Sequence, residues 1–320
     1  MVLSDLDTER QNRASSDLDK MSALEIATLM NREDAKVLRA VRQALPEVAE
    51  AIDVVHDRLA KGGRLIYVGS GTSGRLGALD ASECAPTFGV DPSMVQYVMA
   101  GGENALANAT EASEDSSELG ESDMAARMPG KKDVVVGLAA SGRTPYTIAA
   151  LKYAAKKGAA TIAVICNTGS ELASVAQIAI EAEVGPEVLT GSTRLKAGTA
   201  QKLICNMITT GAMARLGYVY GNLMVNLQLK NEKLIERGIS IVQRIAKVDR
   251  TAALATLETA DMKVPVALVM LCAKVSKTEA NRRLKRAQGS IRKAIEGNWV
   301  RSTAGRASLS MRGISIPAYS

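Results

Sequence analysis

The sequence predicts an α/β fold, in which a mostly parallel sheet is covered by helices on both faces and followed by a small helical domain. Short apolar runs alternate with helical patterns, and continuous apolar runs are typical of parallel strands buried on both faces. A Gly/Ser-rich loop directly follows two of these runs. From Arg194 onward the pattern is helical only. The predicted strands are 64–68, 95–99, 133–138, 161–166 and 178–184.

The helices are predicted from the spacing of apolar residues. A helical lead-in covers about residues 23–60, and a helix follows each of the two loops, one starting near Leu76 and one reaching Lys157. A nearly apolar helix then runs to Leu216, and we expect it to be central core, with its methionines used for packing. A long amphipathic helix follows over about 223–246.

These elements predict three segments. The first, residues 1–248, is the α/β domain with its helical lead-in, and it ends at a polar break around Asp249. A small helical domain follows over residues 249–298. The Ser/Gly/Arg-rich residues 299–320 are expected to form a loosely ordered tail.

The chain has 320 residues and a formal net charge of +6, but the positive charge is concentrated at one end. Residues 271–320 hold eleven Lys or Arg against two Glu, so the rest of the chain is mildly acidic. A basic helical end is more often a solvated face than a nucleic-acid site. Aromatic residues make up only 3% of the chain, which leaves little material for stacking bases. We therefore expect no nucleic-acid partner.

The four cysteines lie far apart and form no CxxC or Cys/His cluster, so the sequence indicates neither a zinc site nor a redox pair. The opening residues carry acids and no apolar signal segment, and the longest apolar run, Val264–Ala273, is too short to cross a bilayer. We expect a cytoplasmic protein with no membrane partner, no metal and no cofactor.

Two loops at the ends of predicted strands carry hydroxyl groups and glycines. The first, 69–75, contains four candidate ligands: Ser70, Thr72, Ser73 and Gly74. Its glycines match the GxGxxG spacing of dinucleotide-binding turns, but no acid follows at the end of the next strand to hold a ribose. Hydroxyls and free N–H groups at a helix start suit a phosphate monoester better.

The second loop, 140–145, repeats this chemistry with Ser141, Gly142 and Thr144, and Pro145 is placed to begin a helix. Loops at the carboxyl ends of parallel strands form one crevice. Each loop alone fits a strand-to-helix turn capped by a hydroxyl equally well. Together they favour a phosphate-binding site.

A third segment, 185–202, opens the apolar helix with a run of hydroxyls and cations. The hydroxyls and cations of this run include Ser192, Arg194 and Lys196. This composition predicts a loop that faces an anion or a polar substrate.

The only histidine, His56, lies in a predicted helix and is expected to be structural, so a Ser-His-Asp or Cys-His mechanism is not favoured. A base that works near neutral pH is then a carboxylate with a raised pKa, or a lysine. Glu83 and Glu114, which follow the first loop in the sequence, are the carboxylates to examine. Both also fit solvated helix carboxylates. Three others compete on sequence grounds: Asp80, Glu111 and Asp115.

Three long motifs of the chain closely resemble those of the N-acetylmuramic acid 6-phosphate etherases, a family of the sugar isomerase (SIS) fold group. They are GSGTSGRLGALDASECAPTFG, GLAASGRTPYT and GPEVLTGSTRLKAGTAQK, in the family's order. The likeness covers about residues 8–297. It departs at Gln11, where the family's TE-x-RN opening has Arg, and Ala139 stands where many SIS proteins have another serine.

The resemblance implies an SIS-type, flavodoxin-like sheet and a bacterial cytosolic homodimer of cell-wall sugar recycling that acts on a sugar phosphate. The implied reaction cleaves the D-lactyl ether of N-acetylmuramic acid 6-phosphate to N-acetylglucosamine 6-phosphate and D-lactate. Its route is ring opening, removal of the C2 proton, loss of lactate from C3 and addition of water. An acid and a base suffice for it, without a metal or cofactor.

By the same resemblance, Glu83 is the acid that protonates the departing lactate oxygen, and Glu114 is the base at C2. The phosphate and sugar contacts fall to residues of all three loops: Ser73, Ser141, Thr144, Glu187 and, more weakly, Arg194 and Lys196.

Two other functions stay open on these motifs. A non-catalytic sensor resembling glucokinase regulatory protein shares the GTSGR and GPE-type motifs, and an aldose-ketose isomerase of the SIS group would also use a carboxylate at C2. Glu83 favours the etherase, because the sensors carry apolar or hydroxyl residues in that helix and an isomerase has no lactyl group to protonate. A nucleic-acid-binding SIS regulator would need a helix-turn-helix domain, which nothing before residue 60 predicts.

Overall fold

The computed structural model describes residues 7–108 and 113–297, and its centre is a sheet of five parallel strands. The strand order is β2-β1-β3-β4-β5. The strands are β1 (Leu65–Gly69), β2 (Val95–Met99), β3 (Val134–Leu138), β4 (Ala160–Ile165) and β5 (Ile178–Glu181). All five lie where the apolar runs predict them, and β1, β3 and β4 are buried throughout. The predicted α/β class with a parallel sheet is confirmed.

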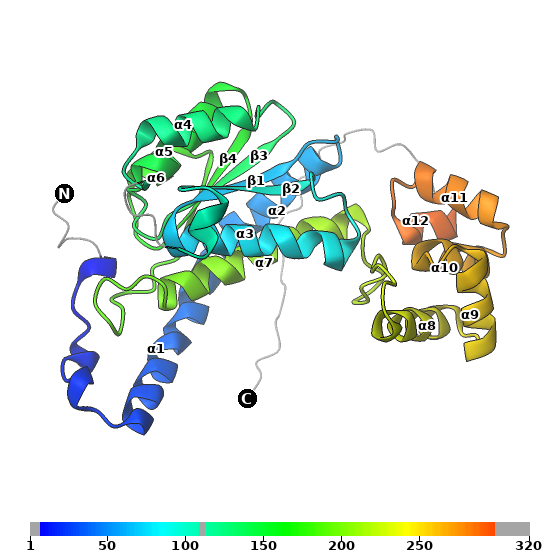
Figure 1. Cartoon of the computed structure of the whole chain (residues 1–320), viewed down its shortest axis with the longest axis horizontal. Coiled ribbons are helices and arrows are strands. Elements are labelled where there is room, and N and C mark those ends of the chain that lie inside the picture. Colours follow the sequence, from blue (N-terminus) through cyan, green and yellow to red (C-terminus); the bar gives the residue numbers. More distant parts are fainter. Residues whose placement is uncertain (1–6, 109–112, 298–320) are drawn as a thin grey trace, which may run out of the picture.

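One face of the sheet packs against three helices: α2 (Leu45–Leu59), α3 (Gly71–Phe88) and α7 (Lys196–Leu216). Tyr67 of β1 and Ile204 of α7 lie in this core. Helix α7 is the nearly apolar helix of the sequence, and its position against the sheet confirms that it is core (Figure 1).

The opposite face packs against α4 (Ser117–Ala126), α5 (Pro145–Lys156) and α6 (Glu171–Val175). Val68 of β1 and Leu151 of α5 lie in this second core. Successive residues of a strand point to opposite faces, which is why Val68 and its neighbour Tyr67 enter different cores. Figure 1 shows the sheet between the two helical layers.

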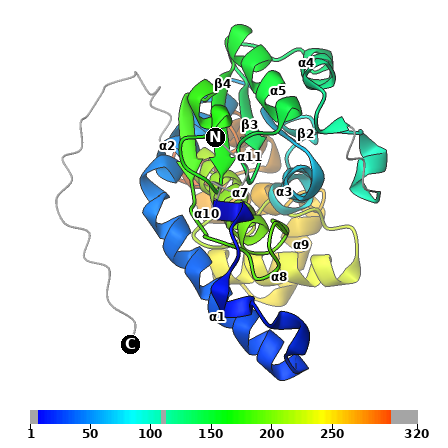
Figure 2. The ribbon, with the colours of Figure 1, turned by 90° about the vertical axis from the view of Figure 1, so that its left-hand side faces the viewer.

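The predicted lead-in consists of α1 (Ala23–Gln43) and α2. A capping box between Ser22 and Glu25 begins α1, and Pro46 in the first turn of α2 marks the break between the helices. Helix α1 packs on α7, while its first turns extend away from the sheet (Figures 1 and 2). From residue 7 onward, three short 3-10 helices precede it: η2 (Asp7–Glu9), η3 (Arg13–Ser15) and η4 (Leu18–Lys20). A fourth, η5 (Glu103–Leu106), follows β2.

Five C-terminal helices form a separate apolar core at one end of the molecule (Figure 1). Val225, Leu257 and Leu268 are buried in it. The helices are α8 (Glu232–Ala246), α9 (Arg250–Thr259), α10 (Val264–Ala273), α11 (Lys277–Arg286) and α12 (Ile291–Glu296).

Helix α8 differs from its prediction in start and in packing. It begins at Glu232 rather than near Leu223, because the side chain of Asn231 caps it by accepting the Leu234 N–H. It packs on α9 and α10, which favours a domain boundary before α8, and the division at 248/249 stays a prediction. The expected tail, 299–320, lies outside the described residues. Within the described ranges, no helix has both the length and the apolar character to cross a membrane.

Candidate active site

The two loops predicted to bind phosphate meet at the point of the sheet where the strand order reverses. Strands β1 and β3 are neighbours, with β2 beyond one and β4 and β5 beyond the other. Gly69 at the end of β1 pairs with Leu138 at the end of β3, so both loops leave from the same point of the carboxyl edge. In open parallel sheets of this order, the connections diverge there and leave a crevice that takes ligands.

Glycines in the first loop let β1 and α3 meet at close range. A Cβ on Gly69 would lie 2.9 Å from the Leu138 carbonyl oxygen, and one on Gly74 would lie 2.8 Å from the Gly69 oxygen. Gly71 has a φ of 49°, a conformation that favours glycine. Ser70 is the N-cap residue of α3, but its side chain makes no capping hydrogen bond. The alternative of a hydroxyl-capped turn therefore does not describe this loop.

The hydroxyl residues of this loop differ in burial and in hydrogen bonding. Ser73 is buried, and its Oγ donates to Gln201 Oε1 at 2.8 Å, while Gln201 donates to the Val164 carbonyl at 3.3 Å. Ser73 thus links α3 to α7 and β4. Ser70 is also buried, whereas Thr72 is half-buried. The Ser73 hydroxyl has one proton, so donating it to a phosphate would break its hydrogen bond to Gln201.

The second loop also depends on a glycine. Gly142 has a φ of 69°, and a Cβ there would lie 2.2 Å from Ser170 Oγ. Ser141 Oγ accepts the Arg143 N–H at 3.3 Å. Thr144 is the N-cap residue of α5 and, like Ser70, makes no capping hydrogen bond with its side chain. Ser141 and Thr144 are half-buried, so neither residue is enclosed by the protein.

Glu114 lies beside both loops. A Cβ on Gly71 would lie 2.9 Å from Glu114 Oε1, so this carboxylate stands over the start of α3. The Glu114 carbonyl accepts the Tyr146 N–H at 3.1 Å, which fixes its backbone to the start of α5. The structure therefore brings one predicted catalytic carboxylate to the predicted phosphate loops.

Glu83, in contrast, lies far along α3. It is twelve residues after Gly71, which corresponds to about 18 Å along the axis of an α-helix. Its side chain is exposed. Carboxylate pairs that act on one sugar in glycosidases are about 5–9.5 Å apart. Within one chain, the structure does not bring Glu83 and Glu114 together.

The competing carboxylates have other positions. Asp80 is buried and accepts hydrogen bonds from the Tyr67 hydroxyl at 2.8 Å and from Asn206 Nδ2 at 2.6 Å. These contacts join α3 to β1 and α7, so Asp80 is structural. Asp115 is exposed, and Glu111 lies outside the described residues.

Glu187 is fully buried and caps α7. Its two oxygens accept the N–H groups of Lys196 at 3.0 Å and Ala197 at 2.9 Å. Burial raises the pKa of Glu187, an effect that the two amides partly offset. A carboxylate at a helix N-terminus also interacts favourably with the helix dipole. Both oxygens are thus held by the chain itself, and a sugar contact of Glu187 stays a prediction.

The side chain of Lys196 is 1% exposed and is paired inside the protein. Its Nζ lies 3.0 Å from Glu33 Oε2 and donates to the Pro186 carbonyl at 2.7 Å. Asn12 donates to the same two acceptors at 2.9 and 3.2 Å. Burial by itself raises the pKa of Glu33, but hydrogen bonds from Lys36, Lys196 and Asn12 outweigh it and lower the pKa to about 2. Lys196 therefore joins α1 to α7, with its charge balanced by Glu33.

The N-terminal segment reaches the second loop through Thr8. Its N–H lies 3.4 Å from Asn167 Oδ1, and Asn167 Nδ2 donates to Thr8 Oγ1 at 3.1 Å and to the Ala140 carbonyl at 3.0 Å. We refer to Thr8, Asn12, Glu33, Asn167 and Lys196 as the N-terminal network. Sequence reasoning missed its first four members as site neighbours. The available signal was the TE-x-RN opening, which contains Thr8 and Asn12.

Two residues of the third segment remain accessible before α7. Ser192 is half-buried, with its N–H bonded to the Leu189 carbonyl at 2.9 Å, and Arg194 is exposed. They are the polar candidates of this segment that can still face a ligand.

The described cysteines are free and inert. Burial raises the pKa of Cys84 and of Cys166 to about 12, so neither thiol supplies a nucleophile near neutral pH. Over residues 7–108 and 113–297, no group of three or more His, Cys, Asp or Glu is arranged to hold a metal.

Two family models match the part of the chain that forms this site. The model of the glucokinase regulatory protein N-terminal SIS domain matches residues 47–155, and that of the SIS domain matches residues 102–211. Together they extend from α2 into α7 and include both loops and Glu114.

Curated proteins named N-acetylmuramic acid 6-phosphate etherase match almost the whole chain. The protein from Clostridium beijerinckii is 50% identical over 294 residues, which cover 92% of this chain and 97% of that protein. The protein from Oenococcus oeni is 50% identical over 295 residues, covering 92% and 99%. The protein from Burkholderia lata is 51% identical over 295 residues, covering 92% and 97%. The likeness therefore extends well beyond either SIS model.

Proposed function

The chain belongs to the N-acetylmuramic acid 6-phosphate etherases, and we propose on that premise that it cleaves the D-lactyl ether of N-acetylmuramic acid 6-phosphate. The products are N-acetylglucosamine 6-phosphate and D-lactate. The observation that carries the proposal is identity at half of the positions over 92% of the chain. That identity favours the etherase over the sensor and the isomerase.

An unactivated ether resists direct hydrolysis, so the proposed reaction proceeds by elimination. Opening of the sugar ring exposes the C1 aldehyde, which acidifies the proton on C2. A base removes this proton, its electron pair forms the C2–C3 double bond, and the C3–O bond breaks as lactate leaves with a proton from an acid. Water then adds its oxygen to C3, and a proton returns to C2.

We assign the 6-phosphate to the crevice between the first and second loops. The helices that begin there, α3 and α5, have no side-chain cap at Ser70 or Thr144, and helix N-termini attract anions through free amides and the helix dipole. The hydroxyls of Thr72, Ser141 and Thr144 add donors at the same place. The phosphate then holds the sugar beside these loops.

We assign proton removal at C2 to Glu114 and protonation of the lactate oxygen to Glu83. The position of Glu114 supports its role, because its carboxylate lies over the start of α3 beside the phosphate loops. Glu83 has its role from the family motif DASECAP alone, since it lies about 18 Å along α3 from Gly71. A positioned acid or base contributes about 10²–10⁴-fold to such a rate.

The family resemblance also supports three wider proposals. The enzyme acts in the cytoplasm, takes part in recycling of cell-wall sugars and works as a homodimer. These proposals rest on the three shared motifs.

The test is to incubate the protein with N-acetylmuramic acid 6-phosphate in deuterated water. We expect release of lactate and deuterium at C2 of the sugar product, because C2 loses and regains a proton. Lactate without deuterium at C2 would contradict the elimination route. Binding of the sugar phosphate with neither lactate nor exchange would identify a sensor and overturn the proposal.

A further inference from the structure

Arg75 is the last residue of the first loop, and the proposed reaction assigns it no role. Its half-buried guanidinium binds the segment that follows β2. Nε donates to the Leu106 carbonyl and Nη2 donates to the Asn108 carbonyl, each at 3.0 Å. A guanidinium is planar and presents its donors as a fixed fork, so two such bonds set both the position and the orientation of what they hold.

The segment that Arg75 binds is a compact turn with hydrogen bonds of its own. It contains η5 (Glu103–Leu106), in which Ala105 is 1% exposed and donates its N–H to the Gly102 carbonyl at 3.1 Å. The Asn108 N–H donates to the Asn104 carbonyl, also at 3.1 Å. Because these bonds tie the turn together, the two bonds from Arg75 fix the whole turn to α3.

The Glu114 carboxylate lies over the same side of α3. Arg75 comes four residues after Gly71, and residues four apart are neighbours on one side of a helix, with about 5–6 Å between their Cβ atoms. A Cβ on Gly71 would lie 2.9 Å from Glu114 Oε1. The turn held by Arg75 and the proposed base therefore lie against one side of α3, about one helical turn apart.

The backbone of Glu114 is held by the second phosphate-loop helix, α5. Its carbonyl accepts the Tyr146 N–H at 3.1 Å. Tyr146 is itself fully buried, and its hydroxyl donates to Asp123 Oδ2 at 2.7 Å. The two helices that begin at the phosphate loops thus also hold the part of the chain that carries Glu114, α3 through Arg75 and α5 through Tyr146.

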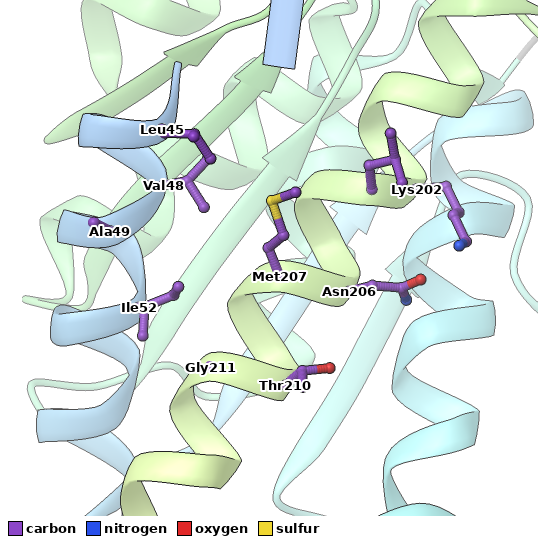
Figure 3. A pocket seen from close by; sticks show the side chains of 10 residues that line it. Leu45, Val48, Ala49, Ile52, Lys202, Asn206, Met207, Thr210 and Gly211 are labelled. Carbon is purple, nitrogen blue, oxygen red and sulfur yellow. The ribbon is translucent and has the colours of Figure 1, made fainter. Parts of the chain in front are cut away.

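Helix α3 is a fixed support for Arg75. Asp80, five residues further along the helix, accepts hydrogen bonds from the Tyr67 hydroxyl of β1 at 2.8 Å and from Asn206 Nδ2 of α7 at 2.6 Å. Figure 3 shows Asn206 on the side of α7 that faces α3. Groups carried by elements that are locked in this way keep a precise geometry.

We propose that Arg75 is a positioning residue, which ties the turn after β2 to α3 and thereby holds the Glu114 carboxylate in place beside the phosphate loops. The proposal rests on the proposed etherase function, with Glu114 as the base at C2. Arg75 spends its donors on Leu106 and Asn108, so it acts through Glu114 and not on the substrate. A displacement of about 1 Å in such a group costs about 100-fold in rate.

The first test compares catalysis with binding. Arg75→Met keeps an unbranched apolar stem but removes the fork, so kcat should fall by about 100-fold. The Kd of N-acetylglucosamine 6-phosphate, measured by calorimetry, should stay at the wild-type value, because the phosphate loops keep their own ligands. Arg75→Lys keeps the charge without the fork and should give an intermediate kcat.

Arg127→Met is the matched control. Arg127 follows α4 and also donates to a backbone carbonyl, that of Tyr97 at 3.3 Å, but it does not bind the turn after β2. Its kcat and its melting temperature should equal those of the wild type. A wild-type kcat in Arg75→Met would overturn the proposal, and so would a weaker Kd with an unchanged kcat.

The second test is a double-mutant cycle with the base. A residue that acts through Glu114 has nothing left to position once that carboxylate is gone, so adding Arg75→Met to Glu114→Gln should cause no further loss of kcat. A further loss as large as that of Arg75→Met alone would show that the two residues act independently, and would overturn the proposal. A wild-type protein that releases no lactate would instead contradict the proposed function.

Discussion

The phosphate loops and the third segment are both rich in polar groups, but they use them in opposite ways. In the segment before α7, Glu187 holds two amides and Lys196 is paired with Glu33, so these side chains are satisfied inside the protein. In the phosphate loops, Ser70 and Thr144 occupy N-cap positions without capping their helices. Buried polar groups that lack partners are costly, so the first arrangement stabilises the fold.

The difference separates two kinds of residue that look alike in the sequence. Changes in the phosphate loops are expected to reduce binding or turnover and leave stability almost unchanged. Substitutions in the N-terminal network are expected mainly to reduce the free energy of unfolding.

The largest effect is expected at the proposed base. Glu114→Gln keeps the size of the side chain but removes the basic oxygen, so lactate release should fall by about 10²–10⁴-fold. The melting temperature should stay close to that of the wild type, because Glu114 anchors the start of α5 through its backbone carbonyl. Glu118→Gln, exposed in the first turn of α4, is the control. A normal rate in the Glu114 variant would exclude it as the base.

Lys196→Met is expected to have the largest effect on stability. It removes one partner of a buried ion pair, and a change of this kind costs about 3–5 kcal/mol of the free energy of unfolding. Urea denaturation measures the loss. Arg194→Met, exposed two residues earlier, should change the same quantity by less than about 0.5 kcal/mol. If Lys196→Met left stability intact and weakened sugar-phosphate binding, Lys196 would belong to the ligand site.

The pairing of Glu33 also predicts how stability depends on pH. Its pKa in the folded protein, about 2, is below the ordinary value of 4.5, so folding favours the ionised form. The stabilisation is complete above pH 4.5 and is lost as the pH falls toward 2. Urea denaturation across that range should show a weaker pH dependence for Glu33→Gln than for the wild type. Equal slopes in the two proteins would contradict the assigned pairing.

The smallest effect is expected for a single hydroxyl of the phosphate loops. Ser141→Ala should weaken binding of N-acetylglucosamine 6-phosphate by about 1–3 kcal/mol, the usual strength of a hydrogen bond to a charged group. Calorimetry gives the Kd, and the free energy of unfolding should change by less than about 0.5 kcal/mol. Ser122→Ala, exposed on α4, is the control. An unchanged Kd for Ser141→Ala would remove that residue from the phosphate site.

Local signals in the sequence were enough to predict the sheet and its two loops. Each strand is a continuous apolar run, and the glycines at 69, 74 and 142 mark places where the structure leaves no room for a side chain. The start of α8 was predicted too early, because apolar residues continue through 223–231 although the cap lies at Asn231. Periodicity reports apolar spacing but not where a helix is capped.

Contacts between distant residues could not be predicted in the same way. The sequence gives the charge of Lys196 but not its partner, because Glu33 lies 163 positions away. Glu83 and Glu114 were paired through a family motif, which carries no information on their separation in one chain. Motifs identify the chemistry of a residue, whereas tertiary contacts decide which molecule or segment it meets.

The contacts of the N-terminal network also limit the order in which parts of the protein can fold during synthesis on the ribosome. Thr8 and Asn12 emerge first, but their partners Asn167 and Pro186 follow 159 and 174 positions later. At roughly 5–20 residues per second, these partners are synthesised about 8–35 seconds after Thr8 and Asn12. Asn12 can therefore contact Pro186 only after the last strand of the sheet, β5 (Ile178–Glu181), has been synthesised, whereas Asn167 becomes available to Thr8 before β5.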